Sequence, residues 1–147
     1  MAGLSDKTRL MTDDALLDSE RFAQRHAASG RSGPLAVERE ALGSDYRATG
    51  YTTKAQADQL GRLLDLRPGK LLVDVGAGCG WPGLYLADTF GCSVVSTDPV
   101  PEGAVAARDR IVADGLEDRA ISVVATGDDL PVRNGSVDAI VHSDVLC

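Results

Sequence analysis

The stretch LLVDVGAGCGWPG, residues 71–83, decides the fold of this chain. Its first five residues form an apolar run with one acid, which is typical of a strand buried on both faces of a sheet. Glycines and Pro82 follow, and proline is favoured in the first turn of a helix. Glycines between a strand and a helix let the backbone pass close to a ligand, beside the unpaired N–H groups of the helix N-terminus. The stretch therefore predicts a strand, a loop that binds a nucleotide-like molecule, and a helix.

Helices and strands alternate along the rest of the chain. Periodic apolar patterns and their end signals predict helices over residues 13–28, 35–42, 53–66, 82–91 and 101–115. Apolar runs predict strands over residues 71–75, 93–97, 121–125 and 137–142. This alternation predicts an α/β fold with a doubly wound, mostly parallel sheet and right-handed connections.

The chain is expected to divide into two parts. Residues 1–50 would form a helical N-terminal appendage or lid, and residues 51–147 the sheet domain. In the helix at 53–66, Thr53 is the expected N-cap. The apolar face of that helix is formed by Ala57, Leu60, Leu63 and Leu64.

Composition and charge narrow the class of protein. The chain has 147 residues, of which 44% are hydrophobic and 25% charged, as is ordinary for a globular domain. A net charge of −7 without a basic cluster argues against nucleic acid as a partner. No signal peptide and no membrane-spanning run is recognisable. Three cysteines without a C-x-x-C pair or metal-ligand spacing predict a reducing, cytoplasmic setting and no metal site.

The spacing of the glycines distinguishes between kinds of nucleotide site. A dinucleotide fingerprint, G-x-G-x-x-G, would place its third glycine at Trp81, and no lysine follows as a phosphate-binding P-loop requires. The loop instead reads as an acid, Asp74, then one residue, then G-x-G-x-G from Gly76 to Gly80. A nicotinamide-dependent oxidoreductase is therefore disfavoured.

This pattern resembles motif I of the class I, Rossmann-like S-adenosylmethionine-dependent methyltransferases. S-adenosylmethionine carries an ammonium and a sulfonium instead of phosphates, so a carboxylate complements its charge. The resemblance implies that Asp74 faces the methionine part, directly or through water. It also implies that the cofactor lies against the backbone of Gly76, Ala77 and Gly78.

A second acidic residue, Asp98, also indicates a nucleoside-binding site. Asp98 lies 22 positions after Gly76 and closes the second predicted strand. An acid at this place accepts hydrogen bonds from ribose hydroxyls in nucleoside-binding sheets of this kind. Asp98 is therefore the expected ribose ligand.

The run 125–147 is similar to the family's segment around its third and fourth strands. The matching elements are Gly127-Asp128, Leu130-Pro131 and Val137-Asp138. Thr126 stands where many members carry the aspartate that binds adenine, so the adenine contact is expected at its hydroxyl or at Asp128, beside Gly127. The resemblance also implies that Ser143 lines the methyl end and that Tyr51 belongs to a segment that folds over the cofactor.

The sequence thus predicts a methyltransferase that uses S-adenosylmethionine and acts on a small molecule, with no catalytic residue identified. The resemblance stops at the fourth strand, so the chain is expected to be truncated relative to the family. An exposed sheet edge at that strand could pair in a homodimer. The alternative is a truncated, non-catalytic module that binds S-adenosylmethionine or only associates through that edge.

Overall fold

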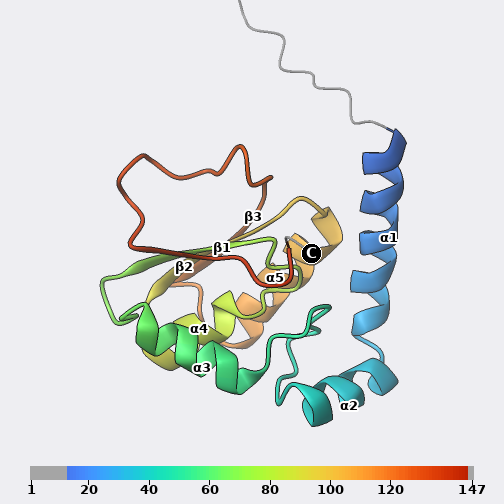
Figure 1. The fold of residues 1–147 in the computed structure, drawn as a ribbon, viewed down its shortest axis with the longest axis horizontal. Helices are drawn as coiled ribbons and strands as arrows, with labels where there is room; N and C mark the ends of the chain where they lie inside the picture. The colour runs from blue at the N-terminus through green and yellow to red at the C-terminus, as the bar shows by residue number, and fades with distance from the viewer. Residues whose placement is uncertain (1–12, 146–147) are drawn as a thin grey trace, which may run out of the picture.

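A computed structural model describes the backbone of residues 13–145 and the side chains of residues 18–145. Its helices are α1 (Asp13–Ser29), α2 (Ser32–Ala41), α3 (Lys54–Leu63), α4 (Gly83–Phe90) and α5 (Pro101–Ala113). Its strands are β1 (Leu71–Val75), β2 (Ser93–Asp98), β3 (Ala120–Val124) and β4 (Ala139–Val141). The strands form one parallel sheet in the order β3-β2-β1-β4 (Figure 1), which confirms the predicted α/β architecture.

The core lies between one face of the sheet and the helices. Leu72 of β1 is level with Val94 of β2 and with Ala139 of β4, and all three are buried. They join one cluster with apolar residues of α4 and α5, among them Leu84 and Ile111. Helices α3, α4 and α5 lie on this side of the sheet, and residues 125–138 pass over the other side (Figure 1).

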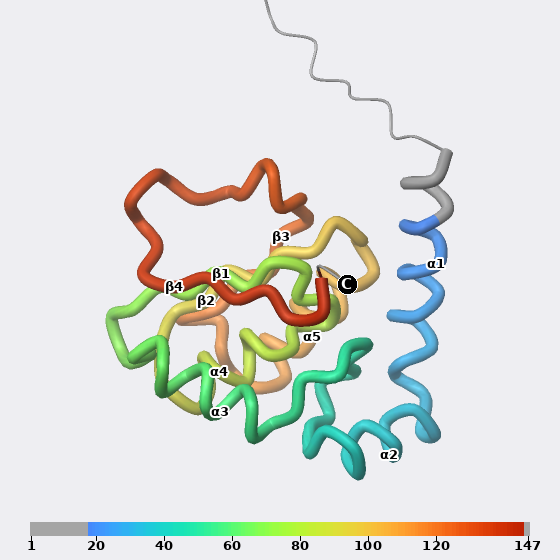
Figure 2. Tube along the Cα trace, viewed as in Figure 1, coloured from blue at the N-terminus to red at the C-terminus, as the bar shows by residue number. Residues whose placement is uncertain are grey.

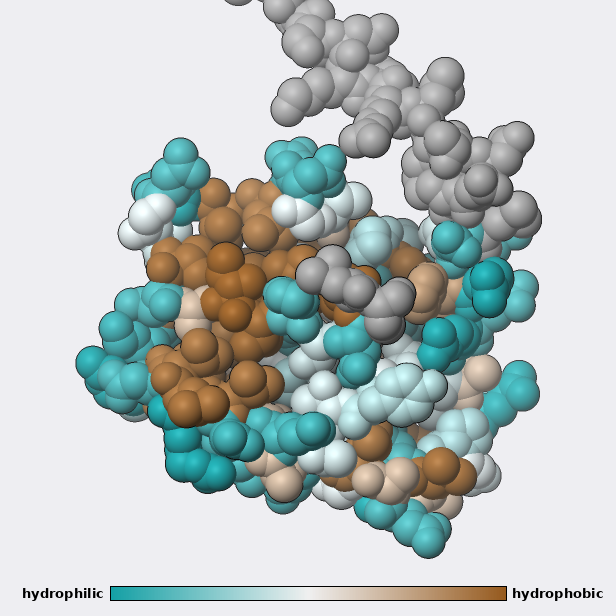
Figure 3. Space-filling view, viewed as in Figure 1, coloured by the Kyte–Doolittle hydropathy of each residue, from teal (hydrophilic) through white to brown (hydrophobic). Residues whose placement is uncertain are grey.

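The opposite face is buried only at its centre. Val73 of β1 and Val95 of β2 are buried, which confirms that the central strand is covered on both faces. At the same level of the flanking strands, Ile121 and Ile140 are 55% and 54% exposed. Hydrophobic surface gathers on the side of the molecule where the strands lie (Figure 3).

Helix α3 begins as predicted but packs differently. Thr53 is its N-cap and forms a capping box with Gln56. Leu63, which the sequence placed on the apolar face of the helix, is 73% exposed. The buried side of α3 includes Gly61, where an added Cβ would lie 2.2 Å from the Phe90 ring of α4. Gly61 therefore permits a close approach of α3 to α4 that a larger side chain at this position would prevent.

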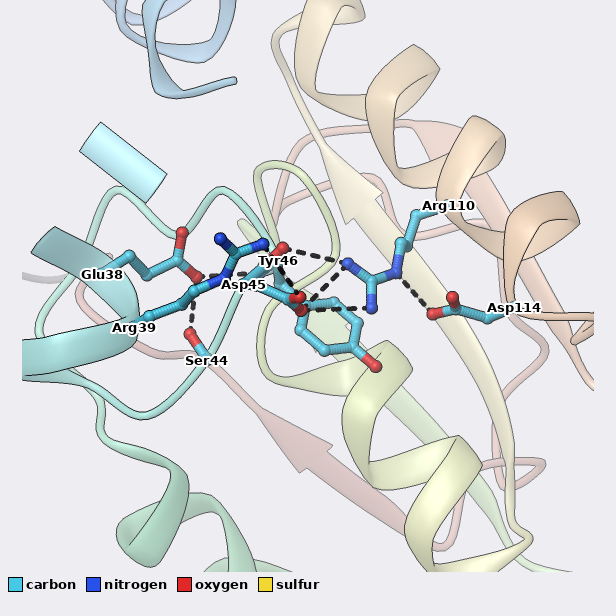
Figure 4. Close-up of polar contacts among 7 residues, drawn as sticks. All are labelled: Glu38, Arg39, Ser44, Asp45, Tyr46, Arg110 and Asp114. Carbon is cyan, nitrogen blue, oxygen red and sulfur yellow. Dashed lines mark hydrogen bonds and ion pairs between the residues drawn. The ribbon is translucent and has the colours of Figure 1, made fainter. Parts of the chain in front are cut away.

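Residues 42–53 lead from α2 back to α3 (Figure 2) and are fastened to α2 by a buried acid. The carboxylate of Glu38 accepts hydrogen bonds from the Ser44 hydroxyl and from the Tyr46 backbone N–H (Figure 4). The same Glu38 oxygen accepts both bonds, which fixes the start of this segment.

The same segment is fastened to α5 by Arg110. Its guanidinium donates to the Asp45 carbonyl and side chain and forms an ion pair with Asp114 (Figure 4). It also lies 3.9 Å from the centre of the Tyr46 ring, a cation–π contact. The N-terminal region is therefore joined to α5 by charged contacts, while the predicted boundary at residue 50 stays a prediction.

Candidate functional site

A cavity of about 450 Å³ lies at the carboxyl ends of the strands. Its walls come from the segments after β1, β2 and β4, from residues 48–51 and from the last turns of α1. The chain leaves β1 toward β2 on one side, and β4 pairs on the other, so the cavity lies at the topological switch point of the sheet. Its volume is within the range of pockets for small ligands.

The glycine loop forms the wall of the cavity above β1. Gly76 and Gly78 have φ angles of 71° and 54°, in the left-handed region that other residues rarely adopt. Both also lack room for a side chain, since an added Cβ would lie 2.6 Å from Val145 and 3.0 Å from His26, respectively. Between them, the Ala77 N–H donates to the Thr97 carbonyl at the end of β2. The loop therefore lines the cavity, while its contact with a cofactor stays a prediction.

Asp74 lies below this loop instead of lining the cavity. Its Oδ2 accepts a 2.7 Å hydrogen bond from the Gly83 N–H at the start of α4. Oδ1 is buried without a hydrogen-bond partner among the described residues. Burial raises the pKa of this carboxyl to about 7, against the lowering effect of the Gly83 bond. The expected contact of Asp74 with methionine stays a prediction, and the structure assigns it a bond to the helix N-terminus.

The fourth glycine of the loop is explained by the same bond. An added Cβ at Gly83 would lie 2.5 Å from the Asp74 carboxylate oxygen. The carboxylate can approach the helix N-terminus this closely only because Gly83 has no side chain. When the carboxyl is ionised, its charge is also favourable at that end of the helix dipole.

Asp98 is buried and lines the cavity at the end of β2. Its Oδ2 accepts the Gly78 N–H and its Oδ1 accepts the Val100 N–H, both at 2.8 Å. A carboxylate has about two acceptor positions on each oxygen, so each oxygen retains one for a ligand. The two backbone bonds hold the carboxylate against the glycine loop.

The segment around Tyr51, which the resemblance indicated, lines the cavity near the end of β4. Asp144 follows β4, and its Oδ2 accepts the Tyr51 and Thr52 N–H groups and the Thr52 hydroxyl. An added Cβ at Gly50 would lie 2.2 Å from that oxygen. The Trp81 indole donates to the Thr52 carbonyl from the other side. Residues 50–52 are thus held between the end of β4 and the glycine loop.

The last turns of α1 supply a wall that sequence reasoning missed. Phe22, Arg25 and His26 line the cavity. Arg25 donates to the Thr49 carbonyl, and the His26 carbonyl accepts from Arg47. The amphipathic pattern of residues 13–28 predicted the helix but contained no signal for the surface that it covers.

The structure brings most of the predicted site residues together. Those that line the cavity are Tyr51, Gly76, Ala77, Gly78, Asp98 and Ser143. Gly127 and Asp128 lie in an exposed segment and do not line it, so their assignment to adenine stays a prediction. Among the described residues, no three His, Cys, Asp or Glu side chains gather as a metal site. Nor is any described helix long and apolar enough to cross a membrane.

The sequence is similar to known methyltransferases. A family model described as "Methyltransferase domain" matches residues 73–147. Methyltransferase GfsG of Streptomyces halstedii is 36% identical over 83 residues, which are 56% of this chain and 30% of that protein. Phosphoethanolamine N-methyltransferase 3 of Arabidopsis thaliana is 41% identical over 86 residues, 55% of this chain and 16% of that protein. The chain therefore spans less than a third of the length of these relatives.

Solved structures resemble the fold. A geranyl diphosphate methyltransferase in complex with SAM is 30% identical, with a TM-score of 0.60, over 80% of this chain and 46% of that chain. A geranyl diphosphate C-methyltransferase from Streptomyces coelicolor A3(2) is 22% identical, with a TM-score of 0.61, over 84% of this chain and 53% of that chain. At 22% identity this second likeness supports the fold alone.

Proposed function

The chain belongs to the methyltransferase domain family, and from that premise we propose that it binds S-adenosylmethionine and transfers the methyl group to a small molecule. The cavity at the switch point is the proposed cofactor site. A relative with 30% identity was solved with SAM, which supports this choice of cofactor.

One observation carries the proposal: a buried carboxylate and a glycine loop line one cavity. The Gly78 N–H holds the Asp98 carboxylate in place, and a position on each carboxylate oxygen is left to accept a hydroxyl. Ribose offers two neighbouring hydroxyls, which suit the two oxygens of one carboxylate. The cavity of about 450 Å³ has room for a nucleoside with an amino-acid chain.

The protein's contribution to the reaction is to position the reactants and exclude water. The bound cofactor would supply an electrophilic methyl carbon. Residues 50–52, held by Asp144, cover the end of the cavity near Ser143, which we assign to the methyl end. Alignment of the acceptor at this place can supply a large part of the rate enhancement. Asp74 would act through the start of α4, which it holds under the loop.

A small-molecule acceptor is supported by the names of the relatives. They include a phosphoethanolamine N-methyltransferase and geranyl diphosphate methyltransferases. A net charge of −7 does not favour nucleic acid as the acceptor.

Calorimetric titration of S-adenosylmethionine into the purified chain tests the cofactor site. Asp98→Asn removes the negative charge but keeps the size of the side chain. We expect it to weaken binding by about tenfold or more, as for a lost hydrogen bond to a charged group. Asp109→Asn is the matched control, because Asp109 is an exposed residue of α5 outside the cavity lining. Absence of saturable binding to the folded wild-type chain would refute the proposal.

A second measurement separates the enzyme from the non-catalytic alternative. The chain is incubated with S-adenosylmethionine and candidate amine and alcohol acceptors, and S-adenosylhomocysteine is quantified. Formation that depends on an acceptor supports methyl transfer. Binding without formation for every acceptor would favour the module that only binds the cofactor.

We further propose a cytoplasmic location and a homodimer through the edge of the sheet. Cys79 and Cys92 are both buried and free, as suits a reducing compartment. Strand β4 lies at the edge of the four-stranded sheet and offers unpaired backbone groups on its outer side. Residues 1–50 would act as the lid of the cavity, because three residues of α1 line it.

A further inference from the structure

His26 faces Asp98 across the cavity from a different part of the chain. It belongs to the last turn of α1 and is 3% exposed. Its Nε2 lies 4.0 Å from Oδ1 of Asp98. This separation is too long for a direct hydrogen bond, whose usual range ends near 3.2 Å. A single oxygen atom at about 2.8 Å from both would bridge them with an angle of about 90° at that oxygen.

The neighbours of His26 determine which ring nitrogen carries the proton. Burial lowers the pKa of His26, with Arg25 and Arg47 acting in the same direction and Asp98 and Glu102 opposing it. The ring is therefore neutral at pH 7 and carries one N–H. Burial also raises the pKa of Cys79, so that side chain keeps its S–H.

The two ring nitrogens of His26 face different neighbours. The Cys79 sulfur lies 3.7 Å from Nδ1 of His26, within reach of a weak S–H hydrogen bond. The sulfur can donate to Nδ1 or accept from it, whereas the acceptor-only carboxylate of Asp98 faces Nε2 and favours the proton on that nitrogen. The gap is thus bounded by one donor and one acceptor, which is the pair that a hydroxyl group satisfies.

The ring is held firmly in this position. The imidazole lies against the glycine loop, where a Cβ on Gly78 would approach its Cε1 to 3.0 Å. Gly103 of α5 also leaves room for it, since a Cβ there would lie 3.2 Å from Nε2. The His26 carbonyl accepts bonds from Arg47 and Ser29, which fix the end of the helix.

We propose that His26 and Asp98 bind the same ribose hydroxyl, with the His26 Nε2–H donating to it and the Asp98 carboxylate accepting from it. The inference rests on the proposed S-adenosylmethionine site. His26 is then a cofactor-binding residue supplied by the N-terminal helix, and the ligand class is a nucleoside with that hydroxyl free. The hydroxyl also connects α1 to the end of β2, so bound cofactor holds the helix to the sheet.

The test uses S-adenosylhomocysteine and its 2′-deoxy and 3′-deoxy analogues, titrated into the full chain. We expect the wild-type chain to bind one of the two analogues at least tenfold more weakly than S-adenosylhomocysteine. His26→Phe keeps a ring against Gly78 but has no donor. This variant should bind S-adenosylhomocysteine about tenfold more weakly than the wild type does. It should bind the weaker of the two deoxy analogues with the same affinity as the wild type does.

Two further variants separate binding from packing. His26→Gln restores an N–H donor and should recover part of the lost affinity. Ser29→Ala removes a buried hydrogen bond at the end of the same helix and should leave the ratio of the affinities unchanged. Equal weakening of all three ligands by His26→Phe would overturn the inference, because a packing defect lowers the affinity for every ligand by the same factor. No binding of S-adenosylhomocysteine to the wild-type chain would instead overturn the proposed function, and the inference with it.

Discussion

The buried carboxyl of Asp74 makes the stability of the fold depend on pH. Its pKa is about 7 in the folded protein, against a value of 3.8 for an unperturbed side chain. Between these values the folded state retains a proton that the unfolded state has lost. The free energy of unfolding therefore falls as the pH rises through this range and levels off above pH 7. At about 1.4 kcal/mol per pH unit, the total is on the order of 4 kcal/mol.

Asp74→Asn isolates this effect, because the amide oxygen can still accept the Gly83 N–H but the side chain no longer titrates. Urea unfolding, followed by fluorescence of the single tryptophan, is measured at pH 5 and pH 7.5. The wild-type chain should lose about 2.5 kcal/mol more than the variant does between these two values. His26, whose pKa is lowered, changes stability in the opposite direction, but it contributes to both proteins and cancels in the comparison.

An equal dependence on pH in the two proteins would refute the reasoning. It would mean that the carboxyl is ionised in the folded state at pH 5, and that water or another group reaches the oxygen without a partner, Oδ1. A steeper fall for the variant would be equally incompatible with a protonated Asp74.

Two further substitutions, with one control, test close contacts. Gly61→Ala places a Cβ 2.2 Å from the Phe90 ring and should destabilise the fold by about 1–3 kcal/mol in urea unfolding. The control Gly33→Ala, whose Cβ would have nothing within 4 Å, should stabilise α2 slightly. Equal changes in the free energy of unfolding for the two variants would contradict the close packing at Gly61. Gly50→Ala meets Asp144 at 2.2 Å and should weaken S-adenosylmethionine binding at least fivefold by calorimetry. Unchanged affinity would show that residues 50–52 do not cover the ligand.

The sequence by itself determined the central unit of the fold. An apolar run, glycines and a helix signal are contiguous, so local preferences were enough to predict β1, its loop and α4. The position of Asp98 followed in the same way, because parallel strands of one sheet end at the same edge. The spacing of the glycines also indicated the methyltransferase family.

Only the tertiary structure decided what surrounds that unit. His26 and Asp144 are separated from the glycine loop by tens of residues, and no local pattern shows that α1 and the end of β4 approach it. The contact of Asp74 with the ligand stays a prediction, but alternation along a strand did not reveal that its carboxylate meets the Gly83 N–H at the start of α4. The Asp74 carboxylate reaches the start of α4 because Gly83 has no side chain in its way. Such contacts depend on side-chain packing between distant segments, which periodicity and spacing do not encode.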